Sequence, residues 1–441
     1  MNTQLMYPET QPAPSLPPQR LPSRSTGPTA RQVMICLAAC MALQMTSYVM
    51  ILPLFARRFS QFGAGVGDLG LSEMAYALAA TVAAPFMGAL SDRLGRRPLV
   101  LGSLAVYVLA FTGYLLASRA ATFILLRGLA GALTAGLIPA ATSMVGDLAP
   151  ADRRARWIGI LSGGASIGWI AGPILGGLLY DRWSYETALL VSIGMAVIAF
   201  ATALVGIRET RSRTAQRSKV SKPRGAAVRT VDLQSAVRSF RATLPVSLAP
   251  LGLVLFIYFA VMFAWAFIEP RLMFYAYDDL GWSSSMLGVV MSTYGVAMML
   301  GEFGLSRLSD DVGRKPIIVL GLILFSAQFI GLALSRNYMV IAAAFVIAGL
   351  GNALFDPALS ASILDMAPSG HQARILGLKS TVGSIGNIAG PALVVLLTPL
   401  LQAQGMFLGA ACIVCLVTLI AVAARSGEKT RRESLPSNVP G

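Results

Sequence analysis

Charged residues are scarce in this chain. Only 12 % of its 441 residues are Asp, Glu, Lys or Arg, against about 25 % in ordinary soluble proteins. Hydrophobic residues make up 55 %, which is enough for roughly a dozen membrane spans of about 20 residues each. This composition excludes a soluble enzyme with one large core, and it excludes a protein with a single membrane anchor. The chain is predicted to cross a lipid bilayer many times.

Cysteine and histidine are nearly absent. The four cysteines, Cys36, Cys40, Cys412 and Cys415, fall inside the first and last apolar runs, where they predict neither a zinc site nor a disulfide framework. The single histidine, His371, falls in a predicted cytoplasmic loop, so proton transfer within the membrane would depend on carboxylates. We expect no metal and no other cofactor.

Motifs of enzymatic chemistry are missing too. The sequence has no Walker-type phosphate loop, no nucleophile elbow and no metal-ligand cluster, which argues against an enzyme and against ATP as the energy source. A net charge of +15 would suggest nucleic acid binding in a soluble protein. Because basic residues also collect in the cytoplasmic loops of membrane proteins, no nucleic acid partner is expected here.

The apolar runs predict an all-α integral membrane protein. Helix is the expected form because an unpaired backbone group in hydrocarbon costs several kcal/mol. Twelve spans are predicted, at 33–56, 73–91, 99–118, 121–147, 155–180, 185–206, 248–275, 283–307, 316–335, 338–366, 373–400 and 404–424.

Polar segments divide these spans into two sets of six. Residues 1–32 are rich in proline and are predicted to form a disordered tail. The six-helix halves 33–206 and 248–424 are joined by a basic linker, 207–247, and a short tail follows at 425–441.

The positions of Lys and Arg predict the orientation. With the N-terminus inside, 28 of the 35 basic residues fall in the tails and cytoplasmic loops, and Arg127 falls within a span. Six fall outside, namely Arg57, Arg58, Arg119, Arg182, Arg271 and Arg336. This bias predicts that both termini and the linker are cytoplasmic. We expect a monomer in a bacterial-type inner membrane.

An internal duplication sets the architecture. The segment 91–98 (SDRLGRRP) returns as 309–316 (SDDVGRKP), and the same offset of 218 residues maps Asp147 onto Asp365 and Gly172-Pro173 onto Gly390-Pro391. Each half has an even number of spans, so the halves are parallel repeats with a binding site expected between them near mid-membrane. Such an architecture is typical of transporters that work by alternating access.

The loop between the second and third spans carries the most specific motif. It reads Gly-Ala-Leu-Ser-Asp-Arg-Leu-Gly-Arg-Arg from Gly88 to Arg97. Gly95 permits a tight turn, and Gly88 permits close helix packing. Helix capping alone is an alternative explanation for the aspartate.

This loop resembles the G-x-L-a-D-r-x-G-r-(R/K) signature of the major facilitator superfamily and matches it at every position. The resemblance covers residues 33–424 and implies twelve helices in two pseudo-repeats, with the loop acting as a cytoplasmic latch that stabilises the outward-open state. The residues it implicates are Gly88, Asp92, Arg93, Gly95, Arg96, Arg97, the acidic partner Asp147, and Asp310, Gly313 and Arg314 of the degenerate second copy.

Two further segments are similar to motifs of that family. Arg127 lies in an R-x-x-x-G pattern whose arginine is tied to proton movement in the family, although its side chain has the alternative of reaching the outer surface. The fifth span reads G-x-x-x-G-P-x-x-G-G and resembles the antiporter motif of drug:proton exporters. That motif comprises Gly168, Gly172, Pro173, Gly176 and Gly177, and glycines at this spacing would also serve simple helix packing.

Proton coupling needs an ionisable group within the membrane. Asp356 is the first candidate, because it lies about nine residues, or ~13 Å, from the inner end of the tenth span. Glu302 is expected ~12 Å inside the eighth span. Glu269 lies nearer the outer side. Each has a structural alternative: Glu269 could reach outer water, and the other two could be inert partners.

The binding cavity is predicted less directly. The proposed lining residues are Gln44, Tyr48, Trp265, Asn352 and Asn387. Aromatic rings beside carboxylates suit amphipathic cations, but ordinary aromatic packing is an equal alternative for any one of them. Three functions remain open: proton-coupled export of small amphipathic molecules, proton-coupled import of a metabolite, and a membrane sensor that has lost transport.

Overall fold

The computed structural model describes residues 28–150, 153–210, 248–305, 308–367 and 372–424. The two expected tails and most of the expected linker lie outside these ranges, so their predicted disorder stays a prediction. The described residues fold into helices without a strand.

The N-terminal half contains six spans. The first runs through α1 (Pro28–Ile51), the short 3-10 turn η1 (Leu52–Leu54) and α2 (Phe55–Gln61). The fourth is divided between α5 and α6. After α2, the helices of this half are, in chain order, α3 (Val66–Leu94), α4 (Arg96–Leu116), α5 (Ala120–Thr134), α6 (Leu137–Leu148), α7 (Arg154–Arg182) and α8 (Tyr185–Gly206).

The C-terminal half repeats this plan. Its first span, α11, ends in the π-helical turn η3, and the start of the second latch copy lies in the helical stretch α13. The elements are α11 (Leu248–Phe274), η3 (Tyr275–Asp279), α12 (Ser284–Leu305), α13 (Leu308–Val312), α14 (Arg314–Leu334), α15 (Tyr338–Met366), α16 (Gln372–Leu397) and α17 (Ala403–Ala423).

The described residues contain twelve helices long and apolar enough to cross a membrane, which confirms the predicted number of spans. Most of their bounds lie within a few residues of the predicted ones. The first span is longer than expected, Ala30–Gln61 instead of 33–56, because η1 and α2 continue the helical path beyond Ile51.

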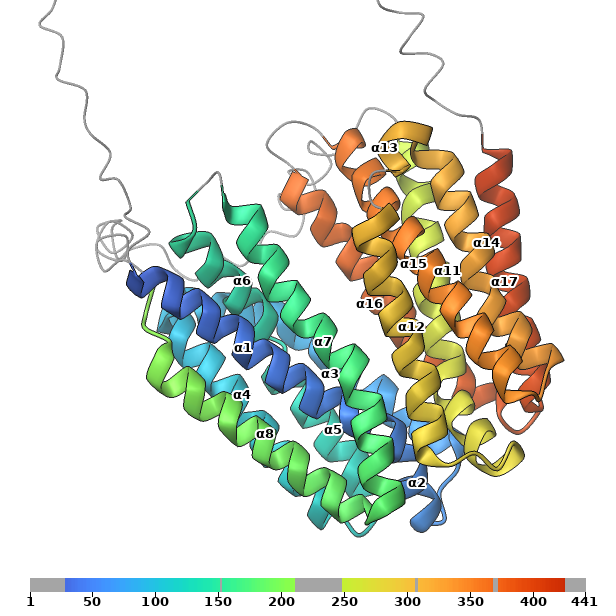
Figure 1. Ribbon diagram of the computed structural model, residues 1–441, viewed down its shortest axis with the longest axis horizontal. Coiled ribbons are helices and arrows are strands. Elements are labelled where there is room, and N and C mark those ends of the chain that lie inside the picture. The colour runs from blue at the N-terminus through green and yellow to red at the C-terminus, as the bar shows by residue number, and fades with distance from the viewer. Residues whose placement is uncertain (1–27, 151–152, 211–247, 306–307, 368–371, 425–441) are drawn as a thin grey trace, which may run out of the picture.

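The two halves diverge towards one end of the molecule (Figure 1). The end at which α1 begins and α17 ends is called here the terminal face, and the opposite end, near α2, is called the distal face. The helices of the two halves are apart at the terminal face and converge at the distal face. The positive-inside prediction identifies the terminal face with the cytoplasm.

Polar contacts join the two halves at the distal face. The Arg57 guanidinium donates to the backbone oxygen of Trp282 at 3.0 Å and lies 4.0 Å from the centre of the Tyr277 ring. The Tyr277 hydroxyl in turn donates to the backbone oxygen of Pro53 at 3.0 Å. These contacts tie the end of the first span to the end of the seventh.

The helices α7 and α12 form the second part of this closure. The Asp181 carboxylate, at the end of α7, accepts hydrogen bonds from the backbone N–H groups of Ser284 (3.0 Å) and Ser285 (2.7 Å). These are N-terminal N–H groups of α12, which have no partner inside their own helix. One half therefore caps a helix of the other, and the cap must break when the distal face opens.

Candidate functional site

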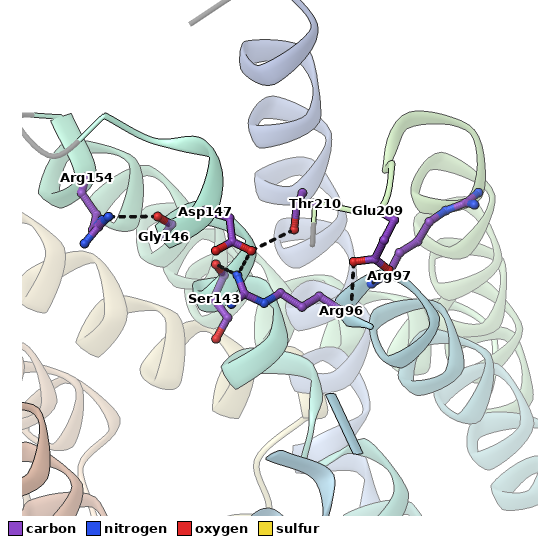
Figure 2. A network of polar contacts seen from close by, with 8 residues as sticks. All are labelled: Arg96, Arg97, Ser143, Gly146, Asp147, Arg154, Glu209 and Thr210. Carbon is purple, nitrogen blue, oxygen red and sulfur yellow. Dashed lines mark hydrogen bonds and ion pairs between the residues drawn. The ribbon is translucent and has the colours of Figure 1, made fainter. Parts of the chain in front are cut away.

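The latch loop lies at the centre of a polar network on the terminal face (Figure 2). The Arg96 guanidinium donates to the Asp147 carboxylate and to the backbone oxygen of Ser143. The Thr210 hydroxyl donates to the same carboxylate at 3.3 Å. Asp147 therefore contacts the arginine cluster as expected from the sequence. These contacts join residues of the N-terminal half to one another and to the first residues of the predicted linker.

The turn between α3 and α4 requires glycine at position 95. Gly95 has a φ of +104°, and a Cβ there would also come within 2.5 Å of the Glu209 carboxylate. That carboxylate accepts from the backbone N–H groups of Arg96 (3.3 Å) and Arg97 (3.2 Å), so it caps the start of α4. Arg97 reaches the backbone oxygen of Leu204 at 2.9 Å. Glu209 was not anticipated from the sequence.

The same contacts recur in the C-terminal half at the same offset of 218 residues. Gly313 has a φ of +102°. The Arg314 guanidinium donates to the Asp365 carboxylate at 3.3 Å. Lys315 donates to the backbone oxygen of Val422 at 2.9 Å. The duplication inferred from the sequence is therefore present in the hydrogen bonds as well as in the fold.

Two other described residues of the latch motif, Gly88 and Arg93, lie in open surroundings. Gly88 was expected to permit close helix packing, but a Cβ there would meet nothing within 4 Å, because the halves are separated at this end. Arg93 is exposed. The side chains of Asp92 and Asp310 lie outside the described part of the structure. A latch across the two halves stays a prediction for the conformation in which the terminal face is closed.

The glycines of the fifth-span motif lie on two packed faces of α7. A Cβ at Gly168, Gly172 or Gly176 would meet the backbone of α1 within the same half. A Cβ at Gly177 would meet the backbone of Ser284 in the other half. The motif therefore serves both internal packing and the seam at the distal face, which is where alternating access requires movement.

Arg127 is fully buried and ion-paired. Its guanidinium, 0 % exposed, donates to the Glu73 carboxylate of α3 and, at 3.2 Å, to the Tyr48 hydroxyl of α1. The alternative in which it reaches the outer surface is therefore wrong. The reason is that burial of an arginine requires a counter-charge, and Glu73 supplies it from the neighbouring helix.

Aromatic rings enclose this ion pair. The Arg127 guanidinium lies 4.4 Å from the ring centre of Tyr76, 5.1 Å from that of Phe55 and 5.8 Å from that of Tyr48. Tyr48 was predicted to line the cavity and lies in this group. Gln44, predicted with it, is fully buried and finds no hydrogen-bond partner for its amide in the described structure. It lines no open surface in this conformation.

A second ion pair lies in the C-terminal half. The Lys379 ammonium of α16 donates to the Asp356 carboxylate of α15 at 2.7 Å and to the Ser360 hydroxyl at 2.7 Å, and it lies 4.4 Å from the Tyr258 ring centre. The lysine side chain is only 10 % exposed, whereas that of Asp356 is 42 % exposed. Asp356 therefore has a partner on one side and an accessible surface on the other.

Of the side chains predicted to bind substrate, Asn352 lies four residues before Asp356 on α15. The Asn352 amide donates to the Tyr294 hydroxyl at 2.6 Å and to the Met298 sulfur at 3.5 Å. The Trp265 ring stacks on Tyr294, with ring centres 6.2 Å apart. Asn387 is exposed on α16. Trp265 and Asn352 thus share one contact, Tyr294.

The two glutamates predicted for proton coupling lie on different helices. Glu302 of α12 is exposed. Its predicted depth of ~12 Å was counted along a helix that reaches Asp310. Because residues 306 and 307 lie outside the described part of the chain, this depth stays a prediction. Glu302 interacts electrostatically with Asp356. Glu269 of α11 interacts with Glu73 and Arg127 across the two halves.

Both partner residues, Glu73 and Lys379, were missed by the sequence analysis. The count of basic residues assigned Lys379 to a cytoplasmic loop, but it lies seven residues inside α16, or ~10 Å along the helix. Both residues fall within predicted spans, which was a signal that they lie in the membrane. Lys379 falls within the predicted span 373–400. Glu73 is the first residue of the predicted span 73–91, and the structure places it seven residues inside α3.

Known bacterial proteins are similar to this chain in sequence. The chain is 27 % identical over 322 residues to the multidrug resistance protein MdtG of Proteus mirabilis (strain HI4320), covering 71 % of this chain and 75 % of that protein. It is 27 % identical over 346 residues to the class B tetracycline resistance protein of Escherichia coli, covering 78 % of this chain and 82 % of that protein.

Solved transporter structures share the fold. The human organic anion transporter MFSD10 matches with a TM-score of 0.64 at 19 % identity, over 89 % of this chain and 99 % of its own. A bacterial homologue of the human lysosomal transporter Spinster matches with a TM-score of 0.68 at 17 % identity, over 90 % and 96 %. The Major Facilitator Superfamily model matches residues 34–277 and 254–440. The chain belongs to the Major Facilitator Superfamily and is a transporter rather than an enzyme.

Proposed function

We propose that this transporter exports small amphipathic or hydrophobic molecules in exchange for protons, with the terminal face in the cytoplasm. The observation that carries the proposal is the Asp356–Lys379 pair, a charged group inside a membrane span with one accessible side. Charged side chains at such positions are costly and are typical of ion pathways. The separation of the helices of the two halves at the terminal face supports a state that admits substrate from that side of the membrane.

Asp356 is suited to bind a proton and a cationic substrate in alternation. Lys379 occupies one of its oxygens at 2.7 Å, which fixes the carboxylate and leaves its other oxygen for an incoming group. When Asp356 is neutral, Lys379 still has the Ser360 hydroxyl and the Tyr258 ring as partners. With Glu302 nearby, the cluster carries one excess negative charge, and Trp265 and Tyr294 offer aromatic faces to a cation.

Export, rather than import, is supported by two further observations. The glycine motif of α7 matches the pattern associated with drug:proton exporters. The relatives at 27 % identity carry the names multidrug resistance protein and tetracycline resistance protein. At this identity the shared function is a proposal for this chain.

The proposal is tested by accumulation of a fluorescent lipophilic cation in a bacterial host that lacks its own multidrug exporters. Expression of the wild-type chain should lower accumulation, and a protonophore should abolish this effect. Asp356→Asn should return accumulation to the level of the empty host, with protein still present in the membrane. Glu302→Gln should impair export less, because Glu302 is more exposed. Asp278→Asn, an exposed carboxylate at the distal end, is the matched control and should export normally.

Normal export by both Asp356→Asn and Glu302→Gln would contradict the assignment of the proton carrier. Accumulation that is unaffected by the wild-type chain for cations and for neutral antibiotics would contradict the proposed substrate class.

Import of a small metabolite with protons is the second candidate. It is favoured by the two intramembrane ion pairs, Asp356–Lys379 and Glu73–Arg127, because a site with groups of both charges suits a zwitterion. An importer would raise the cellular content of its substrate when the outside is acidified, so uptake of labelled amino acids, sugars and organic anions separates the two candidates.

A further inference from the structure

The ammonium group of Lys379 is held in one place beside the accessible carboxylate of the C-terminal half. Its nitrogen donates to the Asp356 carboxylate and to the Ser360 hydroxyl, each at 2.7 Å, and lies 4.4 Å from the Tyr258 ring centre. These contacts come from α15 and α11, and they occupy the three N–H groups that a lysine can donate. The side chain is 10 % exposed, so its charge is fixed within the protein.

A glycine on the same helix as the lysine makes room for the Tyr258 ring. Gly383 follows Lys379 by four residues on α16, so both lie on one side of that helix. A Cβ at Gly383 would come within 2.6 Å of the Cε1 atom of Tyr258, which is too close for a real contact. The absence of a side chain at Gly383 therefore lets the ring lie against α16 and cover the lysine.

The carboxylate of Asp356 has one bound oxygen and one accessible side. Lys379 binds its Oδ1, and the aspartate side chain is 42 % exposed. Asn352 and Ser360 lie one turn before and one turn after it on α15. A cationic ligand on the other oxygen would lie about 6–8 Å from the lysine nitrogen, given ordinary N–H···O distances. At that separation the two positive charges repel each other appreciably inside a protein.

We propose that Lys379 is a specificity-determining residue, a fixed internal cation that limits this site to neutral molecules and to molecules with a single positive charge. The inference rests on the proposed function, in which Asp356 receives the substrate. The lysine offsets the charge of the one carboxylate that it contacts. Each positive charge on a ligand is repelled by the lysine, so a second charge is repelled again. Amphipathic monocations are accepted and dications are disfavoured.

The Asp356–Lys379 pair belongs to one half of the duplicated fold. The positions related to these two residues by the 218-residue offset are Ile138 and Leu161, neither of which is charged. The ion pairs of the latch loops, in contrast, are present in both halves. The lysine is therefore not part of the packing that the two repeats share, which fits a role in ligand selection.

Removal of this charge should strengthen binding in proportion to the charge of the ligand. Lys379→Met should raise the affinity for a monocation roughly tenfold, and that for a dication by a larger factor, up to about a hundredfold. A neutral ligand should bind as before. Glu302 interacts with Asp356, but its charge is the same in both forms and leaves the comparison unchanged. A purely structural role of Lys379 would change the three affinities alike.

The test measures binding to the purified full-length chain in detergent at neutral pH. Equilibrium dialysis, with binding to empty micelles subtracted, compares triphenylphosphine oxide, tetraphenylphosphonium and a bis(triphenylphosphonium), which carry no charge, one positive charge and two. Methionine is about as long as lysine, and water can solvate the half-exposed Asp356 in its place, so Lys379→Met should fold. Thermal unfolding checks this.

Two further variants separate charge from shape. Lys379→Arg keeps the positive charge and should keep the discrimination against the dication. Arg374→Met removes a positive charge from an exposed position five residues earlier on α16, where solvent screens it. It is the matched control and should leave all three affinities unchanged.

The proposal is overturned if Lys379→Met changes the three affinities by one common factor or leaves them as they are, or if Arg374→Met gives the same charge-dependent gain. It is also overturned if neither the wild type nor Lys379→Met binds either cation, because no cation then reaches Asp356. Proton-coupled export of neutral molecules, which is measured by accumulation in cells, would be untouched by that result. Conversely, a charge-dependent gain in binding stands even when cells show no export.

Discussion

At the scale of single residues, the two halves use buried charges differently. Arg127 is fully buried with Glu73 as its partner, whereas Asp356 keeps an accessible side next to Lys379. A pair whose cation is fully buried serves to hold helices together. A pair with one open side serves to exchange ligands. This difference in exposure is the basis for assigning the two clusters distinct roles.

The buried pair makes a testable stability prediction. Arg127→Met should lower the free energy of unfolding by about 3–5 kcal/mol, because it leaves a buried carboxylate without its cation. Glu73→Met should cost less, since Glu269 remains as a counter-charge for Arg127. The double variant should be more stable than Arg127→Met, because one carboxylate, Glu269, then lacks its cation instead of two. Thermal unfolding in detergent, followed by fluorescence, measures the order of stability of these variants. Equal losses of stability in Arg127→Met and Glu73→Met would contradict the prediction.

Residue roles were only partly predictable from the sequence. Arg127, Asp356 and Glu269 were identified because a charge inside an apolar run is conspicuous. Their partners Glu73 and Lys379 were missed since each lies within about two turns of a helix end, where a charge is normally solvated. Only the packing of α3 against α5 and of α15 against α16 shows that these side chains turn inward.

At the scale of helices, the distal closure depends on caps and glycines that cross between the halves. Asp181 of α7 caps α12 through Ser284 and Ser285, and Gly177 allows the two helices to approach at the same level. The sequence motif predicted close packing of the fifth span. It could not indicate which neighbours are involved, because contacts between halves depend on the conformation.

Asp181→Asn should therefore favour opening of the distal face. Loss of a helix cap costs about 0.5–2 kcal/mol, which would lower the ratio of closed to open molecules by about twofold to thirtyfold. Spin labels on Ser118→Cys and Arg336→Cys, two exposed positions at the distal ends of the two halves, measure this ratio by pulsed electron paramagnetic resonance. Asp68→Asn is the matched control, because Asp68 caps α3 inside its own half through the Gly65 N–H at 3.0 Å. An equal shift in both variants would show that the cap across the seam has no special role.

At the scale of the whole molecule, some contacts are present in both halves and others in only one. The ion pairs Arg96–Asp147 and Arg314–Asp365 occupy equivalent positions on the terminal face of each half. The repeat, the twelve spans and the latch turns were predictable, because they leave periodic apolar runs and repeated motifs in the sequence. The opening towards the terminal face was not, since a sequence specifies both states of an alternating-access transporter.

The duplicated pairs should differ in strength. Asp147 is 29 % exposed and Asp365 is 62 % exposed, and Asp147 also binds Thr210. Exposed ion pairs contribute only about 0–1 kcal/mol. Asp147→Asn should therefore lower the unfolding temperature in detergent measurably, whereas Asp365→Asn should have little effect. A larger loss in Asp365→Asn would mean that exposure does not decide which copy stabilises its half.

The central claim is that protons and an amphipathic molecule move in opposite directions through this chain. It is tested most directly in everted membrane vesicles that contain the protein and are energised to be acid inside, with a pH-sensitive dye in the lumen. Addition of a lipophilic cation should release protons from the lumen of wild-type vesicles and not from Asp356→Asn vesicles. Acidification of the lumen on addition of substrate, which means that substrate and protons move together, would contradict the account.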